Sequence, residues 1–145
     1  MEVKISRIHP DVRLPEYKTE GAACFDIESI EDMTVEPGEV KRVHTGLVIK
    51  TPPGFLLAVA PRSSTHKMGL DFPNSFGIFD PDYCGPDDEL TPQVRNFTHE
   101  QVQIEKNQRI GQAFLVEIPK VQWKEVSKKD LGNKSRGGIG STGKK

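Results

Sequence analysis

Residues 55–60, FLLAVA, are the most informative apolar run in this chain for its fold class. A continuous apolar run of this length is typical of a β-strand that is buried on both faces. Turn-forming segments stand on either side of it, TPPG at residues 51–54 and PRSS at residues 61–64. We therefore predict a buried strand between two turns.

Further short apolar runs, separated by proline and glycine, lie on both sides of this strand, and no segment shows a sustained helical period. Turn signals at such regular intervals predict an all-β sandwich or barrel, most simply a jelly roll. At most one short helix is expected, near residues 63–68. The other expected strands are 3–5, 33–35, 40–49, 102–104 and 110–118, with apolar residues Val121, Trp123 and Val126 following.

Length and composition narrow the functional classes. The 145 residues suit a single domain with a modest core, and a net charge of −1 argues against a general nucleic-acid binder. Cys24 and Cys84 form neither a metal-binding spacing nor a disulfide framework. No apolar run has the length of a signal peptide or a membrane span, so we expect a cytoplasmic protein with no membrane contact and no direct nucleic-acid contact.

The C-terminal part is basic, with eight Lys or Arg residues from Lys120 onward against Glu125 and Asp130. Such an end suits a phosphate-bearing ligand, although a solvated end that aids solubility is an equally common reading. The last residues, RGGIGSTGKK at 136–145, cannot form a core element. We therefore divide the chain into a β domain, residues 1–132, and a flexible Gly-rich arm, residues 133–145.

Two segments match known binding motifs in part, but their neighbouring residues do not fit those motifs. The GxGxxG match at residues 138–143 follows no strand of a βαβ unit and precedes no helix. Asp80, Asp82 and Gly85 resemble part of a calcium loop, but Cys84 and Thr91 stand where two ligands are needed.

The segment GIFDPDY, residues 77–83, combines an apolar run, two carboxylates and an aromatic ring. A strand that leads into a proline turn would hold Asp80 at a rigid, partly buried mouth, where a carboxylate can activate a water. Tyr83 would provide a flat wall beside it. Asp-Pro-Asp is also ordinary turn chemistry, so this segment by itself leaves a purely structural role open.

Four other segments carry polar groups in apolar surroundings. Asp26 lies between apolar neighbours in ACFDI (23–27), and Gln112 is a polar amide at the start of an apolar strand. Arg62, Ser63 and Ser64 form a natural phosphate-contacting turn after the buried strand. The backbone N–H groups of residues 136–143 can wrap phosphates. Each has a structural alternative: a turn carboxylate, a satisfied amide, an ion pair or simple disorder.

Taken in order, these segments resemble the five motifs of the trimeric dUTPases over nearly the whole chain. The matching segments are ACFDI (23–27), PRSS (61–64), Asn74 with GIFDPDY (77–83), RIGQ (109–112) and residues 136–143. The third and fifth motifs together are highly specific. The resemblance implies a distorted jelly roll (the dUTPase-like β-clip) and a homotrimer with shared active sites. It also implies hydrolysis of dUTP to dUMP and pyrophosphate, which limits uracil incorporation into DNA and supplies dUMP for dTMP synthesis.

The resemblance also implies roles for single residues. Asp80 matches the general base that activates the attacking water, and Asp26 matches the carboxylate that holds Mg²⁺ through its water shell. Tyr83 matches the ring that packs under the deoxyribose and excludes a 2′-hydroxyl. The remaining matches are Arg62, Ser63, Ser64 and Gln112 for the phosphates, Asn74 with the main chain of Gly77, Ile78 and Phe79 for uracil, Arg136 for the γ-phosphate, and Gly140, Ser141 and Thr142 as arm donors.

The chain departs from the family pattern in several places. Ile139 stands where a Phe usually stacks on the uracil, and the arm before it is short, so that Lys134 is an alternative to Arg136. This short arm and PRSS resemble a subgroup from phages and prophages. Cys24 and Cys84 replace a usual Gly and a usual basic residue. Residues 85–95 are longer and more acidic than is common, and we expect a surface loop there.

Two alternatives stay open. The related dCTP deaminases share the fold and a similar Arg-Ser-Ser turn, but they need a Glu base and usually lack the Tyr, so Asp80 with Tyr83 favours a dUTPase. The second is a dUTPase-like trimer that binds a regulatory protein partner, with the nucleotide as a switch. Ile139 and the acidic segment motivate it.

Overall fold

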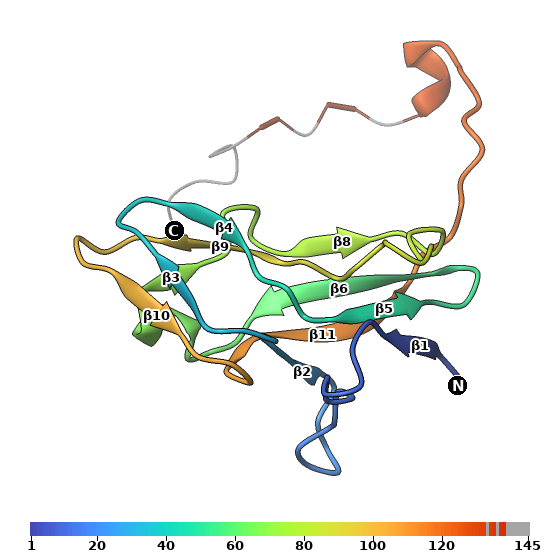
Figure 1. Cartoon of the computed structure of the whole chain (residues 1–145). Helices are drawn as coiled ribbons and strands as arrows, with labels where there is room; N and C mark the ends of the chain where they lie inside the picture. Colours follow the sequence, from blue (N-terminus) through green and yellow to red (C-terminus); the bar gives the residue numbers. More distant parts are fainter. Residues whose placement is uncertain (133, 136, 139–145) are drawn as a thin grey trace.

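The computed structural model describes residues 1–132, 134–135 and 137–138, and this part of the chain is built almost entirely of antiparallel strands (Figure 1). The predicted all-β, jelly-roll-like fold is confirmed. The largest sheet has the order β2–β11–β6–β8, formed by β2 (Phe25–Glu28), β11 (Arg109–Glu117), β6 (Phe55–Pro61) and β8 (Gly77–Phe79).

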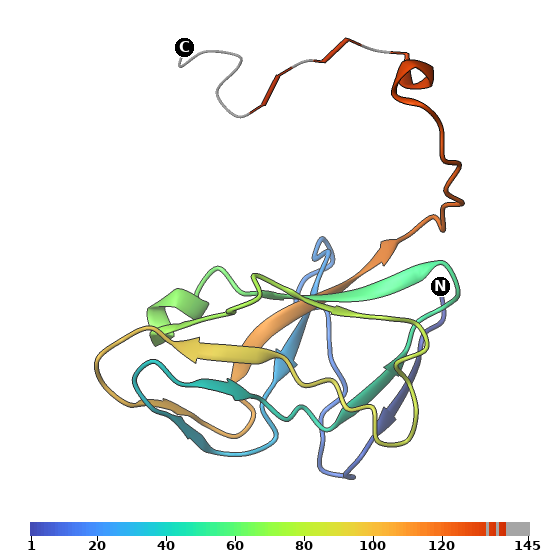
Figure 2. The same cartoon turned by 90° about the horizontal axis from the view of Figure 1, so that it is seen from above.

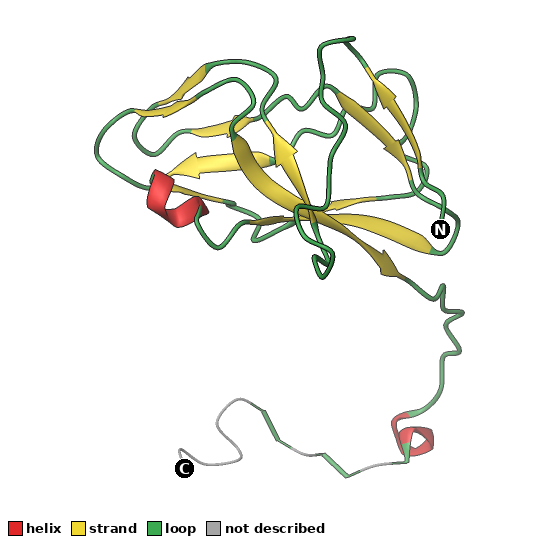
Figure 3. Ribbon diagram, turned by 90° about the horizontal axis from the view of Figure 1, so that it is seen from below, coloured by secondary structure: helices red, strands yellow, loops and turns green. Residues whose placement is uncertain are grey.

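Three smaller sheets complete the body. The first has the order β4–β9–β7, from β4 (Val40–Arg42), β9 (Gln93–Asn96) and β7 (Leu70–Asp71). The other two pair β1 (Lys4–Arg7) with β5 (Leu47–Lys50), and β3 (Met33–Val35) with β10 (Val102–Ile104). Two short 3₁₀ helices, η1 (Thr65–Met68) and η2 (Lys128–Leu131), are drawn in red in Figure 3.

The core lies between these sheets, and β6 is at its centre. Leu57, Ala58 and Val59 are all buried, because β6 pairs with β11 on one side and β8 on the other and both of its faces are covered. Ile27 of β2 and Ile110 of β11 are fully buried in the same cluster. The strand predicted from the run at 55–60 is therefore confirmed.

Three details of the prediction are wrong. The strand expected over 40–49 is split into β4 and β5, which belong to different sheets, because the chain turns at Gly46 with φ +67°. The described residues contain a second short helix, η2, where at most one was expected. The acidic segment 85–95 is not simply a surface loop, since Leu90 is buried and β9 begins at Gln93 with Val94 in the core.

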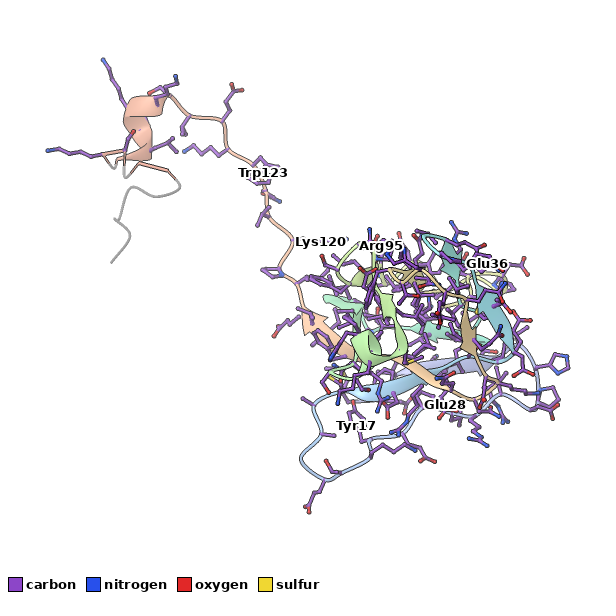
Figure 4. The ribbon with its side chains drawn as sticks, turned by 90° about the vertical axis from the view of Figure 1, so that its left-hand side faces the viewer. Tyr17, Glu28, Glu36, Arg95, Lys120 and Trp123 are labelled. Atoms are coloured by element: carbon purple, nitrogen blue, oxygen red, sulfur yellow. The ribbon has the colours of Figure 1, made fainter. Side chains whose placement is uncertain are left out.

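After β11 the chain leaves the body as an extended segment (Figure 2). Residues 118–127 form no strand, and the side chains of Val121, Trp123 and Val126 are exposed, with Trp123 93% exposed (Figure 4). Neither of the two helices in the described part of the chain has the length or the apolar composition of a membrane-spanning segment.

Candidate active site

Asp26 is the centre of the polar cluster that the fold assembles. Its side chain is 14% exposed, and each carboxylate oxygen accepts a charge-assisted hydrogen bond, Oδ1 from Arg62 Nε at 2.9 Å and Oδ2 from Arg109 Nη1 at 2.9 Å. One carboxylate between two guanidinium groups leaves a net positive charge. The cluster is therefore suited to bind an anion.

The register of three neighbouring strands explains this convergence. Gln112 of β11 lies opposite Asp26 of β2 on one side and opposite Ala60 of β6 on the other, directly before the turn that carries Arg62. Three of the segments singled out in the sequence thus meet at one end of the central sheet.

A β-bulge in β11 brings Arg109 to the same face. Residues three apart in a regular strand point to opposite faces, so Arg109 and Gln112 should not lie together. The register shifts between Arg109 and Gly111, so that Ile110 is the extra residue and enters the core at 0% exposure. Arg109 therefore lies opposite Glu28, on the face that also carries Asp26.

The turn after β6 is held by a buried hydroxyl group. Thr65 Oγ1 accepts a hydrogen bond from the Arg62 backbone N–H at 2.8 Å and donates one to the Ile110 carbonyl at 3.4 Å. Arg62 Nη1 also donates to Ser64 Oγ at 3.4 Å, while Ser63 is exposed. Sequence reasoning overlooked Thr65 and gave Arg109 no role of its own. The signal for Thr65 was a third hydroxyl residue directly after Ser63 and Ser64.

Gln112 is anchored in this cluster. Its side-chain amide donates a hydrogen bond to the Pro61 carbonyl at 3.1 Å. An amide NH₂ group has two donor hydrogens, so one is left for a ligand.

The segment around β8 lies at an edge of the central sheet. Gly77 is buried against β6, whereas Ile78 is 58% exposed and Phe79 is half-buried. In the described part of the chain, β8 pairs only with β6, so its outer backbone groups are available to a ligand. Asn74 is exposed in the tight turn before this strand, where the Ser75 N–H donates to the Phe72 carbonyl at 2.9 Å.

Asp80 and Tyr83 belong to the turn that follows β8. The Tyr83 N–H donates to the Asp80 carbonyl at 3.0 Å, and the Tyr83 ring packs against Phe79 with centroids 5.8 Å apart. The expectation of a partly buried Asp80 is wrong for the single chain, because Asp80 is exposed. It follows an edge strand, and no wall in the described residues of its own chain covers that edge.

The two groups of candidate residues are far apart in one chain. Because β8 runs antiparallel to β6 with Phe79 opposite Leu57, Asp80 and Arg62 lie at opposite ends of this strand pair, six residues or about 20 Å apart. Asp26 is on the opposite edge strand, three strand spacings or about 14 Å from β8. One chain therefore presents two half-sites.

Metal binding by side chains alone does not fit the cluster. Among the described residues, no three or more His, Cys, Asp or Glu side chains are grouped so as to hold a metal ion. Both oxygens of Asp26 already accept from guanidinium groups, although a carboxylate keeps further lone pairs for water. A cavity of about 730 Å³, lined in part by Asp26, Glu28 and Arg13, opens beside the cluster. Asp26 could therefore contact a metal ion only through the hydration water of that ion.

The predicted arm residues cannot be placed. Arg136, Ile139, Gly140, Ser141 and Thr142 lie outside the described residues.

Three comparisons with known proteins agree, since the family model, the curated relatives and the solved structures are all described as dUTPases. A family model described as dUTPase matches residues 11–143. The deoxyuridine 5′-triphosphate nucleotidohydrolase of Nautilia profundicola is 35% identical, over 99% of this chain and 100% of that protein. The crystal structure of the dUTPase from Streptococcus mutans has a TM-score of 0.77 and 27% identity, covering 82% of this chain and 98% of that one. A dUTPase from phage phi11 of S. aureus, described with a structural Mg(II) ion, shares the fold at a TM-score of 0.80 and 19% identity, covering 88% and 98% of the two chains.

Proposed function

This chain belongs to the dUTPase family, and we propose how its residues carry out the hydrolysis of dUTP to dUMP and pyrophosphate. The observation that carries the proposal is the pairing of Arg62 and Arg109 with Asp26, which leaves excess positive charge beside the amide of Gln112. Such a cluster suits a triphosphate, because phosphoryl transfer needs positioning and charge neutralisation rather than a covalent intermediate.

The β8 segment supplies the nucleoside half of the site. The free edge of β8 allows the main chain of Gly77, Ile78 and Phe79, together with Asn74, to hydrogen-bond the uracil edge. Cytosine would present the opposite donor and acceptor pattern and leave these groups unpaired, a mismatch worth up to about 10⁴-fold. The ring of Tyr83 packs under the deoxyribose and excludes a 2′-hydroxyl.

Asp80 acts as the general base. It accepts a proton from a water molecule whose oxygen attacks the α-phosphorus, and the bond from that phosphorus to the oxygen bridging to the β-phosphate breaks. Pyrophosphate leaves and dUMP remains. Arg62, with Ser63, Ser64 and Gln112, holds the phosphates in line during this step.

Mg²⁺ is the cofactor that we propose. Asp26 would hold it through hydration water, and a bound ion would neutralise part of the triphosphate charge. The arm, residues 133–145, closes over the bound triphosphate in this proposal. Arg136 reaches the γ-phosphate there, and Gly140, Ser141 and Thr142 donate hydrogen bonds, with Ile139 at the uracil.

The separation of the half-sites supports a homotrimer with shared active sites. Asp80 of one chain would meet the Asp26 cluster of another, which also explains why Asp80 is exposed in a single chain. The exposed apolar side chains of residues 118–127, Trp123 above all, would be covered by a neighbouring copy. We place this enzyme in the cytoplasm, where the DNA precursor dUTP is its substrate.

A turnover assay tests this function. The protein is incubated with Mg²⁺ and either dUTP, dCTP or UTP, and pyrophosphate and ammonia are measured. We expect pyrophosphate to be released far faster from dUTP than from dCTP or UTP, and no ammonia. Ammonia release from dCTP would assign the chain to the deaminases instead, and no turnover of dUTP would overturn the proposal.

A further inference from the structure

The acidic segment after Tyr83 makes more contacts with the body than its sequence suggests. Asp88 Oδ2 accepts a hydrogen bond from the Gly85 N–H at 2.6 Å, and the Asp88 N–H donates to the Gly85 carbonyl at 3.1 Å. Residues 85–88 are thereby closed into a compact turn. This turn leads directly into Glu89 and the buried Leu90.

Glu89 attaches this segment to the link between β4 and β5. Its side chain is only 15% exposed, Oε1 accepts from the Gly46 N–H at 2.7 Å, and Oε2 lies 2.8 Å from His44 Nδ1. The next residue continues the attachment, because the Leu90 N–H donates to the Leu47 carbonyl at 2.8 Å. A carboxylate that accepts two hydrogen bonds is held in one orientation.

The receiving link is itself rigid. Gly46 has φ +67°, and a Cβ atom there would lie 2.5 Å from Val12 Cγ2. Thr45 is buried and its hydroxyl donates to the Leu90 carbonyl at 2.6 Å. The Gly46 N–H is thus a fixed donor, placed where a side chain of other residue types would not fit.

Tyr83 is connected to this attachment through its hydroxyl group. Its Oη donates to the main-chain carbonyl of Glu89 at 3.1 Å, while its ring packs against Phe79. The ring is therefore held at both ends, by Phe79 near the sheet and by Glu89 at the hydroxyl. The orientation of Tyr83 depends on where the Glu89 backbone lies.

We propose that Glu89 is a positioning residue for sugar discrimination, which holds Tyr83 in the orientation that excludes a 2′-hydroxyl. Its carboxylate fixes its own backbone on His44 and Gly46, and its carbonyl fixes the phenol. This inference rests on the proposed role of Tyr83 and assigns a function to the acidic segment. Glu89 itself need not touch the nucleotide.

The test compares kcat/KM for dUTP and UTP in variants of the full chain. Glu89→Ala removes both acceptors, and we expect the dUTP-to-UTP ratio to fall by about tenfold, since a misplacement near 1 Å can cost as much or more. Tyr83→Phe, which removes only the hydroxyl, should lower the ratio by a similar factor. Glu89→Gln keeps one oxygen for the Gly46 N–H and should lower it by only about threefold. Asp87→Asn, a change at an exposed neighbour in the same turn, should leave the ratio unchanged.

A double variant separates positioning from general destabilisation. If Glu89 acts through the Tyr83 hydroxyl, Glu89→Ala in a Tyr83→Phe background lowers the ratio no further. Additive effects would overturn the inference, and so would a fall in both rates that leaves their ratio at the wild-type value. If Glu89→Ala fails to fold, Glu89→Gln can replace it in the same comparison of single and double variants with Tyr83→Phe.

Tyr83→Ala distinguishes this inference from the function on which it rests. An unchanged ratio in Tyr83→Ala would show that Tyr83 is not the sugar gate. A lowered ratio in Tyr83→Ala with a wild-type ratio in Glu89→Ala would overturn the role of Glu89 alone.

Discussion

Among single residues, Asp26 determines how much positive charge remains in the cluster that it forms with Arg62 and Arg109. Both of its oxygens accept from guanidinium groups, so it orients Arg62 and Arg109 while neutralising only one of them. Each guanidinium group donates one charge-assisted hydrogen bond to Asp26, and these bonds fix the orientation of both arginine side chains. The pairing is partly exposed, so its contribution to stability should be small.

Replacing Arg109 with alanine should separate these two effects. The lost pair is solvent-exposed on the Arg109 side, so the free energy of unfolding should change by less than about 1 kcal/mol. Affinity for a non-hydrolysable dUTP analogue should fall by about tenfold, since the positive charge and the hydrogen-bond donors of the Arg109 guanidinium are lost. Urea unfolding and calorimetric titration measure the two quantities. A large loss of stability with unchanged affinity would contradict this assignment.

Asp80, the proposed general base, gives the second prediction for a single residue. Asp80→Asn keeps the size of the side chain but cannot accept the proton, so kcat for dUTP should fall by about 10²–10⁴-fold with little change in KM. Asp82→Asn, in the same turn, is the matched control and should stay near the wild-type rate. Full activity of Asp80→Asn in a pyrophosphate-release assay would remove Asp80 from the mechanism.

Among single elements, β11 contains a bulge that determines which side chains of the RIGQ segment, residues 109–112, lie on the same face. It places Ile110 in the core and turns Arg109 and Gln112 to one face. Gly111 beside it is closely surrounded, because a Cβ atom there would lie 3.0 Å from Phe72 Cζ and 3.2 Å from the Ala60 carbonyl oxygen.

Gly111→Ala should therefore be destabilising. The neighbouring backbone carbonyl can yield only by shifting β6, so we expect a loss of about 1–3 kcal/mol in the free energy of unfolding. Gly21→Ala is the control, because a Cβ at Gly21 meets nothing within 4 Å, and it should change stability by less than about 0.5 kcal/mol. Denaturant unfolding of both variants checks this, and equal stabilities would contradict the packing argument.

The arm, residues 133–145, is the second element, and its contribution to activity can be measured separately from its contribution to stability. The core is formed by residues up to Leu115, so a chain that ends at Gly132 should keep its melting temperature within a few degrees. Its kcat/KM for dUTP should fall by about 10²-fold or more, since the proposed phosphate donors of the arm are lost together. A truncated chain with wild-type kcat/KM would show that the arm takes no part in the reaction.

At the scale of the whole molecule, the two groups of candidate residues lie at opposite ends of one sheet, and the proposed function combines them from more than one chain. Mixing two inactive variants tests this. Asp80→Asn lacks the base and Arg62→Ala lacks a phosphate contact, yet a mixed oligomer contains sites that combine an intact Asp80 with an intact Arg62. With random mixing we expect about a quarter of the wild-type activity to return. Activity that stays at the level of the separate variants would place each site within one chain. Sedimentation analysis gives the number of subunits.

The all-β class, the buried strand at residues 55–60 and the family could all be predicted from the sequence, because apolar runs between turn residues and ordered motifs are local signals. Other features became visible only in the folded chain. The partnership of Arg109 with Asp26 depends on a bulge and on pairing between strands distant in sequence, and the division of 40–49 depends on which sheets receive its halves. The attachment of Glu89 to His44 and Gly46 joins residues more than forty positions apart. Such contacts follow from chain topology, which no local pattern records.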